Sequence, residues 1–193
     1  MKLSILIATI TERAPQFELL KAHIEAQLPM GEAQVLSLCD NKEMSIGMKR
    51  QRLLEAATGD YVCFVDDDDW VPGDYVQELL KAIESKPDCI GFRIDCSMDG
   101  KPAKAVASLK YQEWGDNKDG FRYVRSPYHK TPIKRKLALK VGFQDMRYAE
   151  DATFSRHIFE HLHTECFIDK VMYYYRYSGK VPHDIKYGIK RAA

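Results

Sequence analysis

No apolar run in this chain approaches the roughly 20 residues that a membrane-spanning helix needs. The N-terminal apolar stretch, residues 1–8, is also too short for a secretory signal peptide and turns polar from Thr9, so we expect a buried strand there. The net charge is only +1, which leaves no overall field to recruit nucleic acid or an anionic membrane. Any binding site must therefore come from local groups of residues.

Disulfide bonds are not expected either. The five cysteines are odd in number and form no Cys-x-x-Cys pair. They are Cys39, Cys63, Cys89, Cys96 and Cys166. Cys39 and Cys63 fall inside strand-like apolar runs, where a thiol behaves as a small buried hydrophobe. The cysteine pattern predicts a reducing compartment, and we expect a cytoplasmic protein.

What the chain does have is enough apolar sequence for a substantial core. Of its 193 residues, 45% are hydrophobic and 30% are charged, which is ordinary for a folded domain. No repeat, low-complexity tract or linker interrupts the first half. We therefore expect a single domain over residues 1–193.

Strand-like and helical segments alternate through the first half of the chain. The expected strands are residues 3–9, 34–38, 61–65 and 89–95, and the expected helices are residues 17–27, 49–57 and 72–85. This alternation predicts an α/β fold with a Rossmann-like, mainly parallel mixed sheet flanked by helices on both faces.

The second half is less regular. Residues 97–120 mix Gly, Lys, Asp and Pro, so we expect a hairpin or a mobile loop there. We expect a helix over 152–162 and a strand over 167–175. The segment 178–193 is basic, and we expect either an ordered lid or a frayed tail.

The most informative stretch is an expected strand that runs into four acids, Asp66, Asp67, Asp68 and Asp69. Ligands of open α/β sheets bind outside the carboxyl ends of the strands. Mg²⁺ and Mn²⁺ take oxygen ligands and keep positions for substrate phosphates. The run therefore predicts a metal–diphosphate site, with a solvated acidic loop as the alternative. A calcium loop is excluded, because its fifth, sixth and twelfth positions would be Trp70, Val71 and Gln77.

Four segments together resemble the family 2-like glycosyltransferases with the GT-A (nucleotide-diphospho-sugar transferase) fold. Residues 4–9, followed by Arg13, resemble the opening strand and nucleotide-binding loop of that family. Residues 47–61 are similar to its Ala-Arg-Asn segment, helix and Ala-Thr-Gly-Glu-Tyr sequence. Residues 64–70 resemble its Asp-x-Asp metal motif, and residues 141–151 its Gly-Phe…Glu-Asp segment. Two positions depart from the family pattern: Gln51 replaces an Asn, and no Gly-Ser-x-Asp loop follows Asp40.

The resemblance implies a division of the single GT-A domain. Residues 1–96 would form the nucleotide-binding half, 97–177 the acceptor and catalytic-base half, and 178–193 the basic tail or lid. The residues that it implies at the donor nucleotide are Thr9, Arg13, Asp40, Lys49, Arg50, Asp66 and Asp67.

The resemblance also implies a different role for each of the four acids. Asp68 would bind the metal directly, and Asp66 would contact the ribose or reach the metal through water. Asp69 would support them. We expect Asp67 to contribute least, because alternate residues of an extended segment face opposite sides. His183 is a further candidate ligand for the metal or phosphate.

Asp151 is the expected general base. A carboxylate beside the acceptor hydroxyl can take its proton as attack develops, and a single displacement inverts the anomeric configuration. The alternative is that Glu150 and Asp151 cap a helix that starts near Ala152. His129 would line the acceptor and donor-sugar site or have a surface or structural role.

These assignments predict a metal-dependent, inverting glycosyltransferase of hexosyl or related groups. Its cofactor would be Mn²⁺ or Mg²⁺, its donor a nucleotide-diphospho-sugar and foremost a UDP-sugar. The acceptor hydroxyl could belong to a glycan, a lipid-linked sugar, a protein or a modified nucleic-acid base. The chain could form a homo-oligomer or act as a partner subunit. The alternative functions are a noncatalytic nucleotide-sugar-binding or partner subunit, or a nucleotidyltransferase. The last usually has a Gly-rich loop after its first strand, and residues 9–15 contain no glycine.

Overall fold

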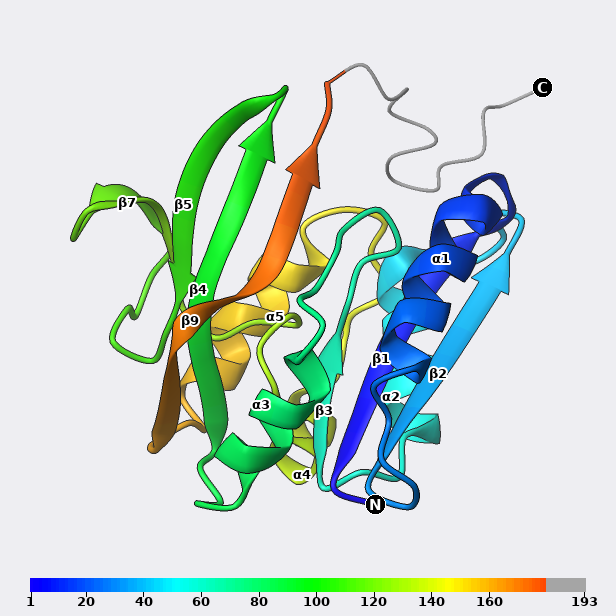
Figure 1. Cartoon of the computed structure of the whole chain (residues 1–193), viewed down its shortest axis with the longest axis horizontal. Helices are drawn as coiled ribbons and strands as arrows, with labels where there is room; N and C mark the ends of the chain where they lie inside the picture. Colours follow the sequence, from blue (N-terminus) through cyan, green and yellow to red (C-terminus); the bar gives the residue numbers. More distant parts are fainter. Residues whose placement is uncertain (180–193) are drawn as a thin grey trace.

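The computed structural model describes residues 1–179, which form one nine-stranded sheet flanked by helices (Figure 1). In chain order the elements are β1 (Leu3–Ile10), η1 (Thr11–Arg13), α1 (Ala14–Glu25), β2 (Ala33–Asp40), α2 (Ile46–Ala56), β3 (Tyr61–Phe64), α3 (Tyr75–Ile83), β4 (Cys89–Met98), β5 (Lys101–Ala107), β6 (Gly115–Lys118), β7 (Phe121–Arg125), β8 (Ile133–Lys134), α4 (Arg135–Val141), α5 (Glu150–Phe159) and β9 (Glu165–Tyr177). Every strand and helix expected in the first half is present, with ends that differ by a few residues. His183 lies outside the described residues.

The sheet is mixed. Its strands follow the order β2-β1-β3-β8-β4-β5-β7-β6, and β9 also pairs with β4. Parallel pairing joins β1 to β2 and to β3, as the alternation predicts. The two-residue strand β8 then separates β3 from β4 and runs antiparallel to both. So short a strand carries no periodicity that a sequence could show.

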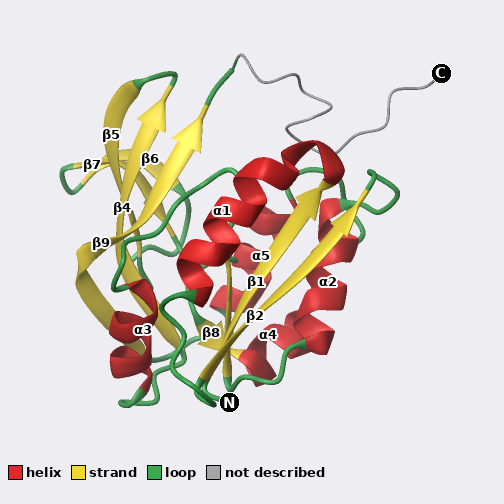
Figure 2. Ribbon diagram, turned by 45° about the vertical axis from the view of Figure 1, so that its right-hand side comes forward, coloured by secondary structure: helices red, strands yellow, loops and turns green. Residues whose placement is uncertain are grey.

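Helices cover both faces of the sheet, as expected (Figure 2). Alternate residues of β1 point to opposite sides. Leu3, Ile5 and Ile7 pack in a cluster with residues of α1 and α3, whereas Leu6 packs in a second cluster with residues of α2, α4 and α5. This alternation on β1 and β3 produces two apolar layers that hold the strands rigidly.

The segment 97–120 forms ordered strands. Residues of β4 and β5 pair as an antiparallel hairpin, which turns at Asp99 and Gly100, and β6 follows. The hairpin alternative is therefore confirmed. The short helix α4 and the strand β7 were not expected.

Within residues 1–179 no helix is both long enough and apolar enough to cross a bilayer. All five cysteines are free thiols in the structure.

The parallel strands bring separate polar segments to one edge of the sheet. Ile10 of β1 pairs with Asp40 at the end of β2, and Leu6 pairs with Phe64 at the end of β3. The four-acid run therefore leaves β3 beside Thr9 and Asp40. This carboxyl edge is where a ligand site of an open α/β sheet is expected.

Candidate active site

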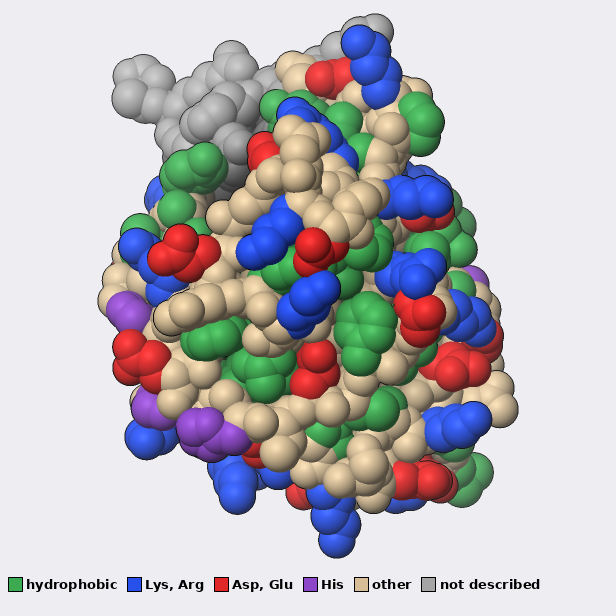
Figure 3. Space-filling model, turned by 90° about the vertical axis from the view of Figure 1, so that its left-hand side faces the viewer, with side chains coloured by type: hydrophobic (Ala, Val, Ile, Leu, Met, Phe, Trp, Pro, Cys, Tyr) green, Lys and Arg blue, Asp and Glu red, His purple; other side chains and the backbone are tan. Residues whose placement is uncertain are grey.

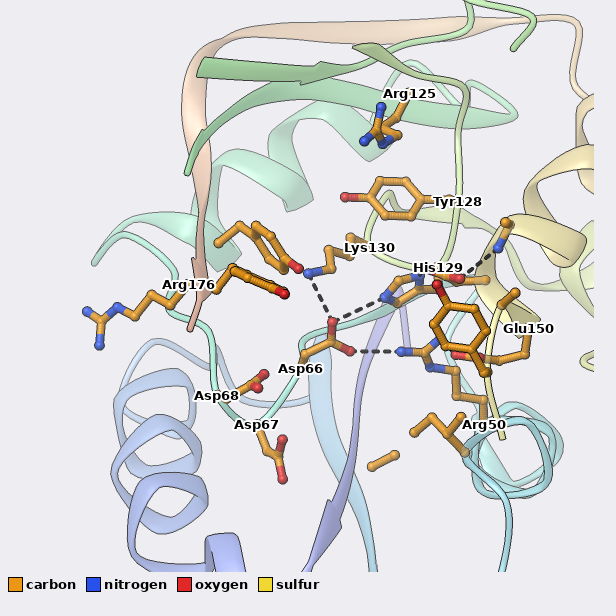
Figure 4. Close-up of a pocket in the computed structure, with 18 of the residues that line it drawn as sticks. Arg50, Asp66, Asp67, Asp68, Arg125, Tyr128, His129, Lys130, Glu150 and Arg176 are labelled. Carbon is orange, nitrogen blue, oxygen red and sulfur yellow. Dashed lines mark hydrogen bonds and ion pairs between the residues drawn. The ribbon is translucent and has the colours of Figure 1, made fainter. Parts of the chain in front are cut away.

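The four acids form a turn rather than an extended segment. The strand β3 ends at Phe64, and the amide of Asp69 donates a hydrogen bond of 3.1 Å to the carbonyl of Asp66. The expectation that alternate acids face opposite sides of a strand was therefore wrong. Figure 4 shows the carboxylates of Asp66, Asp67 and Asp68 pointing in different directions.

Asp66 is surrounded by cations. One carboxylate oxygen accepts a hydrogen bond of 2.9 Å from Arg50, and the other lies 2.9 Å from the ammonium of Lys130. The Nε2 atom of His129 is 3.4 Å from the second oxygen. Burial acts to raise the pKa of Asp66, but Lys130 and Arg50 hold it well below its usual range. Asp66 is therefore ionised, and both of its oxygens already have partners.

Asp69 anchors the end of the turn to β9. It is buried, and it accepts hydrogen bonds from Lys130 at 2.6 Å, from the Tyr173 hydroxyl at 2.8 Å and from the amide of Arg176 at 2.7 Å. The Lys130 ammonium also lies 4.4 Å from the ring centroids of Tyr173 and Tyr175. Burial acts to lower the pKa of Lys130, but the two acids Asp66 and Asp69 raise it well above its ordinary value. Asp69 and Lys130 therefore form a buried ion pair.

Asp67 ties the turn to β1. Its carboxylate accepts a hydrogen bond of 2.6 Å from the Thr9 hydroxyl and one of 2.5 Å from Arg13. The buried side chain of Asp67 therefore links the acid turn to β1 and η1. Its expected contact with the donor nucleotide stays a prediction.

Asp68 is the acid that faces solvent. Its side chain is 41% exposed, against 26% for Asp66, and it lies 3.4 Å from Arg13. Partial desolvation and the charges of Asp69, Asp66 and Asp67 raise the pKa of Asp68 to about 7. An added cation would relieve this repulsion, and a carboxylate is a ligand that hard divalent cations prefer.

Asp151 lies in the first turn of α5, not at its cap. The helix begins at Glu150, and its N-cap is Ala149, whose φ is 60°. The expected capping role of the Glu150–Asp151 pair was therefore wrong. One oxygen of Asp151 accepts a hydrogen bond of 2.8 Å from the amide of Ala152, and the other is 3.9 Å from Nδ1 of His129.

His129 stands between the acid turn and Asp151. It is buried, and its Nδ1 has no hydrogen-bond partner within the described part of the chain. Desolvation and the positive charge of Arg50 lower the pKa of His129 to about 4, so the ring is neutral near pH 7. The histidine therefore lines the pocket and does not lie at the surface, whereas the structural role that was also an alternative stays open.

Arg50 joins the two acidic segments. Its guanidinium donates to Glu150 as well as to Asp66, and it lies 5.7 Å from the ring centroid of Phe64. Three residues on separate elements are thereby held at fixed distances. The buried Arg50 orients the acids, and its contact with the donor nucleotide stays a prediction.

Lys49 and Asp40 pair with each other. The Lys49 ammonium lies 2.7 Å from Asp40 and 2.8 Å from the carbonyl of Thr9. The second oxygen of Asp40 accepts a hydrogen bond from the amide of Met44.

Gln51, which departs from the family pattern, makes a local contact. Its side-chain oxygen accepts a hydrogen bond of 2.7 Å from the amide of Phe143.

One pocket of about 470 Å³ collects most of the predicted site residues. Those that line it are Thr9, Arg13, Lys49, Arg50, Asp66, Asp67, Asp68, His129 and Asp151. Asp40 is adjacent through Lys49 rather than in the lining. The opposite wall contains Trp114, Tyr123 and Arg125, for which the sequence analysis assigned no role.

Residues 40–147, more than half of the chain, match the family model described as Glycosyl transferase family 2. The chain belongs to glycosyl transferase family 2. The family resemblance drawn from the motifs is thus confirmed. A curated relative of this family 2 chain is the Bacillus subtilis protein named "Putative glycosyltransferase EpsH", which is 26% identical over 74 residues, or 37% of this chain and 22% of EpsH.

Solved structures share the fold. S. aureus TarS 1–349 superposes with a TM-score of 0.69 at 17% identity, covering 91% of this chain and 60% of that one. A crystal structure of the same TarS segment in complex with UDP-GlcNAc matches equally well, with coverages of 92% and 59%. The mannosyltransferase PcManGT from Pyrobaculum calidifontis, in complex with GDP-Man and Mn²⁺, superposes with a TM-score of 0.61 at 14% identity, covering 93% and 58%.

These similarities confirm the GT-A-type fold. The family 2 chain spans about three fifths of the matched TarS segment and less than a quarter of EpsH.

Proposed function

We propose that this chain transfers a hexosyl or related sugar from a nucleotide-diphosphate donor to an acceptor hydroxyl, with inversion at the anomeric carbon. The observation that carries the proposal is one pocket lined by both the exposed acid Asp68 and the candidate base Asp151. Family membership supports a transferase. The complexes of TarS with UDP-GlcNAc and of PcManGT with GDP-Man and Mn²⁺ support a nucleotide-sugar donor, and we favour a UDP-sugar.

Asp68 fits a divalent cation, Mn²⁺ or Mg²⁺. Its carboxylate faces the pocket. The charges of Asp69, Asp66 and Asp67 disfavour the ionised form of Asp68, and a bound cation would offset this repulsion. Within residues 1–179 no group of three or more His, Cys, Asp or Glu side chains could hold a metal. We therefore propose that Asp68 would bind the cation together with the donor phosphates, with Asp66 linked through water. When bound, the cation would neutralise the charge that develops on the leaving diphosphate.

The donor nucleotide would lie on the β1 side of the pocket. Thr9 and Arg13 line this side and hold Asp67 in place. Lys49 and Arg50 supply positive charge behind the acids. This supports the assignment of residues 1–96 to the donor and of 97–177 to the acceptor and base.

Asp151 would remove the proton of the attacking hydroxyl. It lines the same pocket as the acid turn, and its side chain is 30% exposed, so an acceptor can reach it. His129 lies beside Asp151, with its Nδ1 3.9 Å from a carboxylate oxygen, and its ring is neutral near pH 7 because its pKa is lowered to about 4. Direct attack by the activated hydroxyl on a donor held by the acid turn would be a single displacement, which would invert the anomeric carbon.

Two substitutions test the proposal. Asp151→Asn removes the base, so turnover of a nucleotide sugar should fall about 100-fold or more while UDP affinity is retained. Asp68→Asn should remove the gain in UDP affinity that Mn²⁺ gives. Calorimetry with UDP, with and without Mn²⁺, and a donor-hydrolysis assay over a panel of nucleotide sugars measure both effects.

Asp169→Asn is the matched control, because Asp169 is 68% exposed on β9 and pairs with Arg93 at the surface. It should change neither measurement. UDP binding without turnover of any donor would favour the noncatalytic binding subunit instead. Full turnover by Asp151→Asn would show that another residue is the base.

A further inference from the structure

The wall of the pocket opposite the acid turn contains a cation held between aromatic rings. The Arg125 guanidinium, at the end of β7, lies 4.8 Å from the ring centroid of Trp114 and 5.2 Å from that of Tyr123. Its Nη1 donates hydrogen bonds to the carbonyls of Gly115 at 3.1 Å and Val124 at 2.9 Å. Rings and carbonyls together fix the plane of the guanidinium.

One edge of this guanidinium remains available. Within residues 1–179, neither Nε nor Nη2 of Arg125 makes a hydrogen bond. The acid nearest to it, Asp116, is 53% exposed, and its contact of 3.8 Å is with Nη1. By contrast, Arg50 and Lys130 in the same pocket each hold two acids. In the described part of the chain, Arg125 is therefore a partly buried cation with a single long contact to an exposed acid, and its Nε and Nη2 carry no hydrogen bond.

The aromatic wall is tied to the helix that carries the candidate base. The indole N–H of Trp114 donates a hydrogen bond of 3.1 Å to the hydroxyl of Ser155, which is buried on α5. Ser155 is four residues after Asp151, so the two side chains lie on the same face of the helix. A single helix therefore sets the positions of both Asp151 and the Trp114 ring under Arg125.

A row of rings separates Arg125 from the acid turn. Trp114 packs edge-on against Tyr128 at 5.5 Å, and Tyr128 against His129 at 4.9 Å. Figure 4 shows Arg125 and Asp66 at opposite ends of this group, with Tyr128 between them. In Figure 3, on the side of the molecule that carries β5 and β7, basic, acidic and hydrophobic side chains are mixed. A group bound at Arg125 would belong to a part of the acceptor remote from the attacking hydroxyl.

We propose that Arg125 binds a carboxylate or phosphate group of the acceptor, so that the acceptor is an anionic saccharide. This inference rests on the proposed function. A guanidinium with a free edge recognises two oxygens of one anion through parallel hydrogen bonds. Stacking on the aromatic rings holds the guanidinium plane in one orientation before the anion binds.

The test is glycan-array binding by the full chain saturated with UDP and Mn²⁺, so that the donor-phosphate positions are filled. The array has neutral glycans, uronate-containing glycans, sugar phosphates and sugars linked through diphosphate to a short isoprenyl chain. The last three groups distinguish the source of the anion. Wild type should bind anionic members in preference to neutral ones, and Arg125→Gln should weaken that binding about tenfold or more.

Arg122→Gln is the matched control. Arg122 is an exposed arginine on the same strand, 5.3 Å from the same Tyr123 ring, and it lies outside the pocket lining. It should bind like wild type, and Arg125→Lys should keep part of the preference because the charge remains. UDP affinity, measured by calorimetry, checks that each variant is folded.

Preference of the wild type for neutral glycans, or no anionic glycan bound at all, would overturn the inference. So would anionic binding that survives in Arg125→Gln. UDP affinity and donor hydrolysis would be intact in those cases, whereas failure of the proposed function would abolish them.

Discussion

At the scale of single residues, Lys130 joins the two ends of the acid turn, because its ammonium lies 2.9 Å from Asp66 and 2.6 Å from Asp69. Replacing it with Met would leave the buried Asp69 carboxylate without its cation. Breaking a buried ion pair from one side is costly, so Lys130→Met should lower the free energy of unfolding by about 3 kcal/mol or more. Urea unfolding followed by circular dichroism measures the loss.

A double variant that also changes Asp69, the other member of the ion pair, provides the control for Lys130→Met. Adding Asp69→Asn removes the unpaired charge and should restore part of the lost stability, because a neutral amide is cheaper to bury than a carboxylate. A loss below about 1 kcal/mol for Lys130→Met alone would contradict a buried ion pair at this position.

At the scale of elements, the contact between the start of α2 and the loop before α5 sets the distance between the donor acids and the base. The amide of Gly47 donates a hydrogen bond of 3.0 Å to the carbonyl of Met146. A Cβ at position 47 would lie 1.9 Å from the carbonyl oxygen of Gln144, so only glycine permits this approach. α2 also carries Arg50, which binds Glu150 and Asp66.

Gly47→Ala should therefore lower the free energy of unfolding by about 1–3 kcal/mol, because the loop must move away from α2. Turnover should fall as well, since the shift alters the position of Asp151 relative to Asp66. Gly73→Ala is the control, because a Cβ at Gly73 meets nothing within 4 Å and should change neither quantity. Chemical denaturation and donor hydrolysis test both variants, and equal effects of the two would refute the close contact.

At the scale of the whole molecule, Asp88 joins three distant parts of the chain. It lies 2.9 Å from Lys134 on β8, and it accepts hydrogen bonds from the amides of His163 at 3.0 Å and Thr164 at 3.1 Å before β9. Desolvation opposes ionisation, but these partners lower the pKa of Asp88 to about 2. The ordinary value in an unfolded chain is about 3.9, so the ionised form favours folding.

Because the folded pKa is depressed, this stabilisation is complete above about pH 4 and is lost as the pH falls towards 2. Asp88→Asn should therefore lower the free energy of unfolding by about 2 kcal/mol at pH 6, and the difference from wild type should shrink towards pH 2. The exposed Asp169→Asn serves as the control. Urea unfolding as a function of pH measures the difference in the free energy of unfolding between Asp88→Asn and wild type. A difference that is constant from pH 6 to pH 2 would refute the lowered pKa of Asp88.

Local patterns were enough to predict much of this fold. The strands of the first half and the helices between them depend on apolar spacing and on residues that end helices, and these act within about ten residues of chain. The carboxyl edge where Asp66–Asp69 lie follows from the parallel order of β1 and β3, which the alternation also predicts. The order of the motifs identified the family, because each motif is a short contiguous segment.

Longer-range geometry could not be predicted in the same way. The antiparallel β8, with two residues, has no periodicity of its own, and its place between β3 and β4 depends on pairing with both. The strand assumption for the acids failed because a hydrogen bond from Asp69 to Asp66 closes a turn there. The sequence did not decide whether His129 lines the pocket or has a surface or structural role, because burial depends on what the rest of the chain packs over it.

The sequence by itself determined that this chain forms an α/β domain with a run of acids at a strand end, a Glu-Asp segment late in the chain and the motifs of family 2. Only the tertiary structure decided which charges meet: Arg50 with Glu150, one hundred positions later, Lys130 with Asp69, and Arg125 with the ring of Trp114. The physical reason is range. Apolar periodicity and turn preferences act between neighbours in the chain, whereas ion pairs and ring contacts form between residues that only the packed sheet and helices bring within a few ångströms.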